Sequence, residues 1–322
     1  MAAPAVPTPS MLRPRKGTGY RRFKSGLATV LIVFAFVAAA VPLIALVYYI
    51  TKEGLKVFSW DFLTSELPFS TRSTDGGIGP AVVGTIVITL GATLMAVPLG
   101  VLGGIYLNEY AGKSKFGALV RFLSEILTGV PSIVMGLFIY IFWVLRFKEQ
   151  TGFAGSLALA CLMLPVVIRT SEEMLKLVPH ELREGSLALG SRKSRTIRTV
   201  VLPHAAPGIV SGSLLAVARA AGETAPLLFT IGATQTANWN LFEGTNTALS
   251  VQIFGNATSP FIPAQERAYG AAFTLILMVF VATTLARIVT VIYTRRTSGA
   301  GGCRGNNSGP PRVFEPHGRV YS

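Results

Sequence analysis

The sequence predicts an all-α integral membrane protein that crosses the bilayer six times. Of its 322 residues 51% are hydrophobic and only 14% charged, whereas about a quarter of a soluble domain is charged. Apolar runs of membrane-spanning length recur along the chain, and one long basic segment that can form helices lies between two of them. These observations predict a bundle of membrane helices with one docking segment outside the bilayer.

Six apolar runs account for the predicted spans. We expect Pro98 to break the second span and Pro131 to lie within the third. Gly100 and Gly104 have the small-xxx-small spacing that lets two membrane helices approach closely. The spans are predicted at about 27–50, 81–107, 122–145, 153–170, 208–232 and 268–293. Polar loops are predicted at 51–79 and 241–267.

The ends of the chain flank a six-helix transmembrane domain predicted at 27–293. Residues 1–26 form a basic N-terminal tail, and residues 294–322 have the composition of a disordered tail. A cleaved signal peptide is an alternative for the N-terminus, because Ala38–Ala40 imitate a cleavage site. The apolar run is twice the usual signal length and continues past that point, which favours a first transmembrane helix.

The distribution of basic residues predicts the orientation. Most of the 29 Lys and Arg residues lie in the two tails and in the connections at 109–121 and 169–204. Because cytoplasmic loops carry the excess of Lys and Arg, both termini and these connections are predicted to be cytoplasmic. The expected location is a cell membrane, crossed several times.

Several function classes are disfavoured by the sequence. The net charge is +14, and the basic residues lie in clusters beside apolar runs and not on one basic face. We therefore expect the chain to contact the lipid bilayer and expect no nucleic-acid partner. Phosphate-binding and hydrolase motifs are missing from the sequence, and two cysteines and three histidines form no metal-type cluster. We therefore expect a non-catalytic chain that itself binds no cofactor and no metal.

Two charges inside the fifth predicted span are the strongest candidates for a site. Counted from Gly208, Arg219 lies about 16 Å along the helix, and Glu223 lies one turn further on the same face. Charge at that depth is costly, so the pair must face protein or a watery cavity. In one interpretation Arg219 attracts an anion and Glu223 helps to release it. In the other, the two side chains only form an ion pair with each other or hold a partner helix in place. The candidate pathway residues are Arg219, Glu223 and the adjoining Thr224.

Other charges near the inner ends of spans have simpler interpretations. Arg169 at the end of the fourth span is expected to reach the cytoplasmic headgroups, with a pathway role as the alternative. Arg121 and Glu125 are four residues apart, which predicts a local helical ion pair.

The docking segment, 176–206, is predicted to fold as two short helices. Leu182, Gly185, Ser186 and Leu189 share one helical face, and Gly190 is expected to end that helix in a positive-φ conformation. A second helix is predicted from Ser191 to about Val201, closed by Pro203.

The spacing in this segment resembles the coupling-loop motif of ABC-importer permeases of the type I (MetI-like) kind. That motif reads Glu-Ala-Ala, then Gly, then Ile-x-Leu-Pro, and this chain departs from it at Gly185, Ser186 and Val200. The resemblance implies that the segment docks into a cytoplasmic ATPase. The residues implied to couple are Glu184, Gly185, Ser186, Gly190, Leu202 and Pro203.

A wider resemblance covers most of the chain and is to PstA-type permeases of bacterial phosphate importers. It implies six helices, a heterodimer with a PstC-like permease, a PstB-like ATPase homodimer that holds ATP and Mg, and an extracytoplasmic phosphate-binding protein. It also implies that Arg219 and Glu223 correspond to a charged pair implicated in transport. The segments that carry it are at 76–85, 129–138, 164–175 and 218–229.

The expected function is therefore half of the transmembrane path of an ATP-driven phosphate importer. A permease for sulfate, molybdate or phosphonate is the nearest alternative. A channel or membrane scaffold that works without an ATPase is a third, and the docking segment argues against it.

Overall fold

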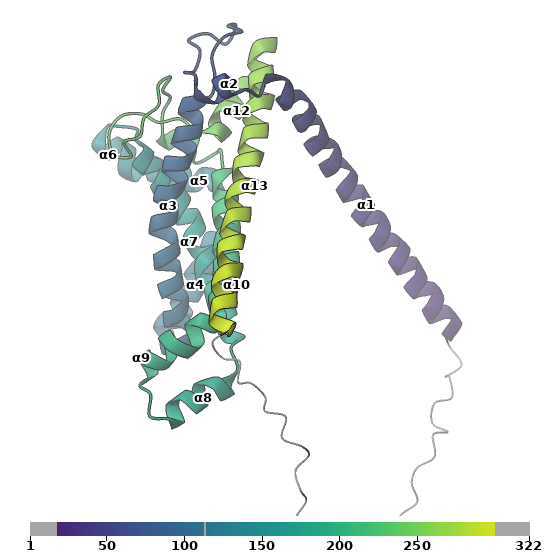
Figure 1. The fold of residues 1–322 in the computed structure, drawn as a ribbon, viewed down its shortest axis with the longest axis vertical. Coiled ribbons are helices and arrows are strands. Elements are labelled where there is room, and N and C mark those ends of the chain that lie inside the picture. The colour runs from purple at the N-terminus through teal and green to yellow at the C-terminus, as the bar shows by residue number, and fades with distance from the viewer. Residues whose placement is uncertain (1–17, 113, 300–322) are drawn as a thin grey trace, which may run out of the picture. The chain divides into compact units, whose positions relative to one another are not determined.

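The computed structural model describes residues 18–112 and 114–299, and throughout these ranges the regular elements are helices (Figure 1). The predicted tails up to residue 17 and from residue 300 lie outside the described residues. The all-α prediction is confirmed. The α-helices are α1 (Thr18–Val57), α2 (Trp60–Thr64), α3 (Gly79–Ile105), α4 (Lys115–Gly129), α5 (Ser132–Ile139), α6 (Leu145–Phe147), α7 (Gly152–Lys176), α8 (His180–Ala188), α9 (Lys193–Thr196), α10 (Leu202–Ala221), α11 (Leu227–Thr230), α12 (Leu249–Ala257) and α13 (Ile262–Gly299). Three π-helical turns join some of them: η1 (Tyr106–Ala111), η2 (Tyr140–Val144) and η3 (Ile197–Val201).

Five helices in the described residues are long and apolar enough to span a membrane, and a sixth span results if a bent pair counts as one. The pair is 115–129 with 132–147, bent by 105°. The third predicted span is therefore not one straight helix. Val130 precedes a proline, and at ψ 130° it has left the helical region because the proline ring clashes with a helical neighbour.

Pro98, in contrast, does not break the second span, because α3 continues through it and into η1. The predicted close approach at Gly100 and Gly104 is confirmed. A Cβ at Gly100 would lie 2.7 Å from the Val167 Cβ, and one at Gly104 would lie 2.5 Å from the Ser171 Cβ. Both contacts are with α7, so these glycines fix how closely the two helices pack.

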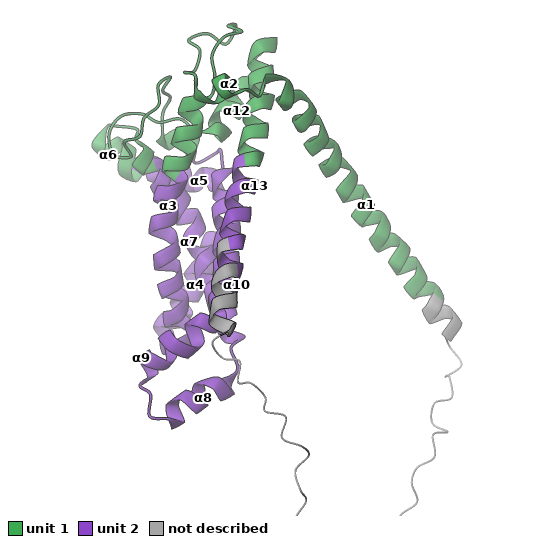
Figure 2. Cartoon of the chain, in the orientation of Figure 1, with its two compact units in different colours: residues 1–88, 142–154, 227–277 green, residues 89–141, 155–226, 278–322 purple. Residues whose placement is uncertain are grey.

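The chain divides into two compact units (Figure 2). Unit 1 comprises residues 1–88, 142–154 and 227–277, and unit 2 comprises 89–141, 155–226 and 278–322. In unit 1 the end of α1 packs on the start of α13, with ring centroids 5.5 Å apart for Tyr49 and Tyr269 and 5.3 Å for Phe58 and Phe273. The apolar run of α1 is otherwise exposed.

The loops of unit 1 contain more structure than the sequence predicts. Helix α12 forms inside the predicted polar loop at 241–267, and α13 begins before its end. The start of α12 is held by the buried Thr85 hydroxyl, which accepts a hydrogen bond from the Leu249 N–H at 2.8 Å. A tertiary partner therefore stabilises a helix too short to be obvious from periodicity.

Unit 2 has an apolar core between the end of α7 and the start of α10. The helix that contains α10 is continuous from residue 193 to residue 221, so the prediction that Pro203 closes the preceding helix is wrong. Pro203 lies in the first turn of α10, directly after η3. The wide turn of η3 and this position both accommodate a residue without an N–H. The core residues are Leu175, Val178, Val201, Ala205 and Ile209.

Candidate functional site

Arg219 and Glu223 contact each other at the end of α10. Their Nε and Oε1 atoms are 3.5 Å apart, with the Arg219 side chain 75% exposed and that of Glu223 22% exposed. The predicted helical continuation to residue 232 is not observed. Helix α10 ends at Ala221, and Gly222 is its C-cap, so Glu223 lies in the turn beyond the helix. The carboxylate therefore approaches the guanidinium from a turn.

A cavity of about 190 Å³ in unit 2 surrounds this pair. At about 30 Å³ per water molecule, this volume holds a small anion with a few waters. The turn that follows Glu223 is fixed by close packing: a Cβ at Gly136 in α5 would overlap the Pro226 backbone. The lining residues are Leu127, Thr128, Val130, Pro131, Ser132, Leu162, Met163, Val166, Ala216, Arg219, Ala220 and Glu223.

The bend between α4 and α5 supplies the polar wall of the cavity. Thr128 and Ser132 add hydroxyl groups from either side of the bend, and the positive end of the α5 dipole begins there. Thr224, a half-buried described residue, lies outside this lining. One exposed guanidinium beside hydroxyl groups is an arrangement that can donate hydrogen bonds to an oxyanion, and a carboxylate next to it would weaken such binding by charge repulsion.

Arg169 lies in a different cavity, of about 200 Å³, between α4 and α7. It pairs with Glu173 at 3.3 Å and with Glu125 at 3.9 Å. The predicted Arg121–Glu125 pair is therefore wrong. Arg121 instead donates from Nε to Glu172 in α7 at 2.8 Å, because the bundle brings this better shielded carboxylate within reach.

The Glu172 carboxylate joins a small ion network. Its side chain is 7% exposed, and it accepts both from Arg121 and from Lys176 at 2.7 Å. Arg121 also donates to the Leu107 carbonyl at 2.8 Å, in η1 at the end of the long helix that begins as α3. One guanidinium therefore connects three helical segments of unit 2.

The predicted docking segment folds as α8, α9 and η3. Gly190 has φ 79°, so the prediction that it ends the first helix in a positive-φ conformation is confirmed. The Ser186 and Thr196 hydroxyls lie 2.9 Å apart across the turn. Leu202 packs on the core of unit 2, while nothing lies within 4 Å of a Cβ at Gly185.

Glu109 holds the docking segment in place, and the sequence did not lead us to predict this role. Its side chain, in η1, is 7% exposed and pairs with Arg183 of α8, which also donates to the Leu175 carbonyl at 2.7 Å. Lys193 donates to the Glu109 carbonyl and lies 4.8 Å from the Tyr110 ring centroid. The sequence signal that could have indicated this role is an acidic residue at the end of an apolar run, next to a basic connection.

Comparison with known proteins identifies the chain's relatives. Residues 96–299 match the family described as "Binding-protein-dependent transport system inner membrane component". The phosphate transport system permease protein PstA of Mycobacterium leprae is 41% identical over 87% of this chain and 92% of its own length. That of Yersinia pestis is 40% identical over 85% and 92%. The chain belongs to the PstA family.

As a PstA-family member, the chain is a multi-pass membrane protein and a permease subunit of an ABC importer complex, without a catalytic role of its own. Among solved structures, an inward-facing MetNI methionine ABC transporter is similar over 68% of this chain and 94% of its own, at 20% identity and a TM-score of 0.49.

Proposed function

We propose that this chain forms half of the translocation pathway of an ATP-driven inorganic phosphate importer in a bacterial inner membrane. Both relatives named above are phosphate permeases. The observation that carries the proposal is the Arg219–Glu223 pair, which lines a small cavity together with two hydroxyl groups. A guanidinium fork matches the oxygens of a tetrahedral anion, and the pair would hold phosphate briefly during passage.

The same helix supports a coupling role for the docking segment. Residues 193–221 are one continuous helix, so displacement at its start reaches Arg219 over about 39 Å without crossing a loop. We propose that a PstB-like ATPase homodimer, carrying ATP and Mg, pushes on α8 from the cytoplasm. A PstC-like permease completes the path, and an extracytoplasmic phosphate-binding protein delivers the ion. Both termini are cytoplasmic in this arrangement.

Phosphate uptake by the complete transporter tests the pathway assignment. We expect Arg219→Ala to abolish uptake and Glu223→Gln to reduce it, while the complex still assembles. The matched control is Arg169→Ala, which removes another exposed arginine of unit 2. Wild-type uptake in Arg219→Ala and Glu223→Gln would leave the pair a structural role only.

A single guanidinium can also donate two hydrogen bonds to sulfate, molybdate or phosphonate, so these oxyanions are the alternative substrates. Competition by each of these anions against labelled phosphate distinguishes the candidates. Half-maximal inhibition by sulfate at a lower concentration than by unlabelled phosphate would transfer the assignment to sulfate.

A further inference from the structure

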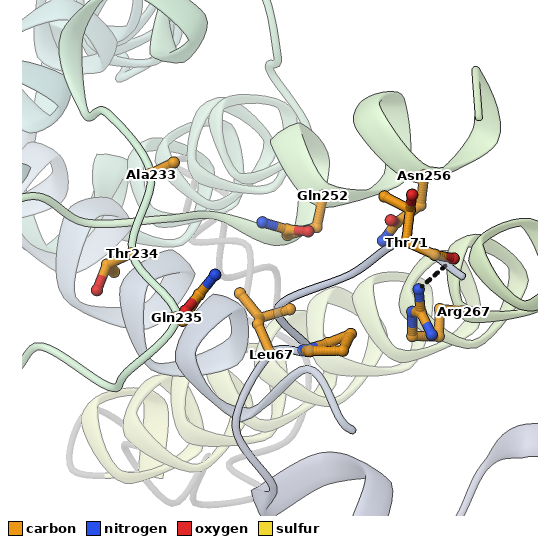
Figure 3. Close-up of a pocket in the computed structure, with 9 residues that line it drawn as sticks. Leu67, Thr71, Ala233, Thr234, Gln235, Gln252, Asn256 and Arg267 are labelled. Atoms are coloured by element: carbon orange, nitrogen blue, oxygen red, sulfur yellow. Dashed lines mark hydrogen bonds between the residues drawn. The ribbon is translucent and has the colours of Figure 1, made fainter. Parts of the chain in front are cut away.

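Unit 1 contains a cavity of about 470 Å³ whose walls come from two loops and from helices α12 and α13 (Figure 3). Its polar lining consists of hydroxyls, amides and one guanidinium, and among the described residues that line it there is no carboxylate. Its apolar side chains are two in the 65–79 loop and one alanine. The lining residues are Leu67, Pro68, Thr71, Ala233, Thr234, Gln235, Gln252, Asn256 and Arg267.

Arg267, in the first turns of α13, is the charged group of this cavity. It is 3% exposed. Its Nη2 donates to the Thr71 carbonyl at 3.1 Å, a contact visible in Figure 3, and its Nη1 donates to the Ser73 carbonyl. Within the described part of the chain, its buried Nε has no hydrogen-bond partner. A buried cation is costly unless an anion compensates it, and carbonyl groups compensate only part of the charge.

Asn256 of α12 adds a second buried polar group. It is 7% exposed, and no hydrogen bond to its side chain is found among the described residues. The Gln252 amide donates to the Thr247 hydroxyl at 3.0 Å, which fixes its direction. Amide N–H groups and hydroxyls are the donors that an oxyanion accepts from.

The cavity walls are held in place without a ligand. The Leu67 N–H donates to the Gln235 carbonyl at 3.1 Å, which joins the 65–79 loop to the 231–248 loop. The Arg72 guanidinium lies 4.7 Å from the centroid of the Phe261 ring. A preformed site loses little freedom on binding, so a single guanidinium with neutral donors is enough for measurable affinity.

We propose that this cavity is an oxyanion site of unit 1, which binds free inorganic phosphate through Arg267 and Asn256. The missing counter-charge at Arg267 calls for an anion, and the cavity has room for a tetrahedral ion with part of its water shell. A lipid would need a continuous apolar flank for its chains, whereas the apolar side chains of this lining are only Leu67, Pro68 and Ala233. The lining loops belong to segments that the charge distribution predicts to be extracytoplasmic, where phosphate arrives. The site stands on its own contacts and does not require the Arg219 assignment.

Equilibrium binding of labelled inorganic phosphate tests the site. The purified transporter is used whole, without nucleotide or binding protein, in phosphatidylcholine nanodiscs, and with Arg219→Ala to remove that contribution. In this background Asn256→Asp places a carboxylate against the anion and is expected to weaken binding at least about tenfold. The matched control is Ser70→Asp, an exposed residue whose hydroxyl accepts from the Arg72 N–H at 3.3 Å. Aspartate makes the same contact, so binding is expected to be unchanged.

Each outcome decides between the assignments. The site is supported if Asn256→Asp weakens phosphate binding while the Ser70→Asp control leaves it unchanged. Weakened but measurable phosphate binding in Arg267→Lys would argue against general misfolding. Equal affinity for phosphate in Asn256→Asp and in Ser70→Asp overturns the proposed site. If Arg219→Ala alone removes all binding, the pathway assignment stands and this one fails. If phosphatidylglycerol in the nanodiscs abolishes phosphate binding, a lipid headgroup is the occupant and the free-anion proposal is wrong.

Discussion

Replacing Glu109 with glutamine tests whether the docking segment is mechanically tied to α3 as well as to α10. The Glu109 and Arg183 side chains are 7% and 15% exposed, so solvent screens their interaction little. Glutamine keeps the shape and one acceptor oxygen but removes the charge. Lys193 bonds the backbone carbonyl of Glu109, and the substitution leaves that contact in place.

The expected cost follows from the geometry. Hydrogen bonds to charged groups contribute about 1.5–3 kcal/mol, roughly twice a neutral one. Because Arg183 retains a neutral acceptor and the Leu175 carbonyl, only the difference between the two kinds of bond is lost, and we expect Glu109→Gln to cost about 1 kcal/mol locally. That energy corresponds to a change of about fivefold in the opening equilibrium of α8.

Hydrogen exchange of the α8 amides in the assembled transporter measures this opening. Exchange is expected to accelerate about fivefold. The phosphate transported per ATP is expected to fall, because α8 then moves without pulling on α3. The control is Glu181→Gln, which removes an exposed carboxylate from the first turn of the same helix. Exchange within twofold of the wild type in both variants would refute the reasoning, as would a normal transport-to-ATP ratio despite faster exchange.

Two further predictions concern the packing of unit 2. Gly104→Ala is expected to destabilise the purified chain by about 1–3 kcal/mol, since its Cβ would lie 2.5 Å from a side chain of α7. Gly255→Ala, with nothing within 4 Å, is the comparison in the same thermal-stability assay; equal melting of the two variants would contradict the helix contact. Arg121→Ala is expected to lower thermal stability because it leaves a 7% exposed carboxylate with one cation fewer. Arg169→Ala breaks ion pairs whose side chains are more than half exposed, so it should change thermal stability little. A larger loss of thermal stability in Arg169→Ala than in Arg121→Ala would show that the Glu172 network does not stabilise the fold.

The sequence predicted those parts of the structure that depend on local chemistry. Apolar runs longer than a bilayer core must form helices, because a spanning backbone has to satisfy its own hydrogen bonds. The positive φ at Gly190 and the close approach at Gly100 and Gly104 follow from what glycine permits, and both were predicted and confirmed.

Proline effects were predicted less well, because they depend on what surrounds the ring. Pro98 and Pro203 lie inside continuous helices, while the turn at Pro131 bends its helix pair by 105°. Sequence alone gives each proline the same missing N–H and the same ring. Packing around the freed carbonyls decides whether the helix continues.

Partners of charged groups were decided only by the tertiary structure. Spacing predicted Glu125 for Arg121, but the bundle offers the more buried Glu172, 51 residues away, which binds better because less water competes for it. The same holds for Glu109, whose partner in α8 is 74 residues away. Arg219 and Glu223 were predictable as a pair, yet the helix end between them, and the cavity beside them, depend on how α5 packs on Pro226. The sequence therefore determined which segments are membrane helices and which charges they carry. Tertiary packing selected the partners of those charges, because a long-range contact depends on geometry that no local pattern records.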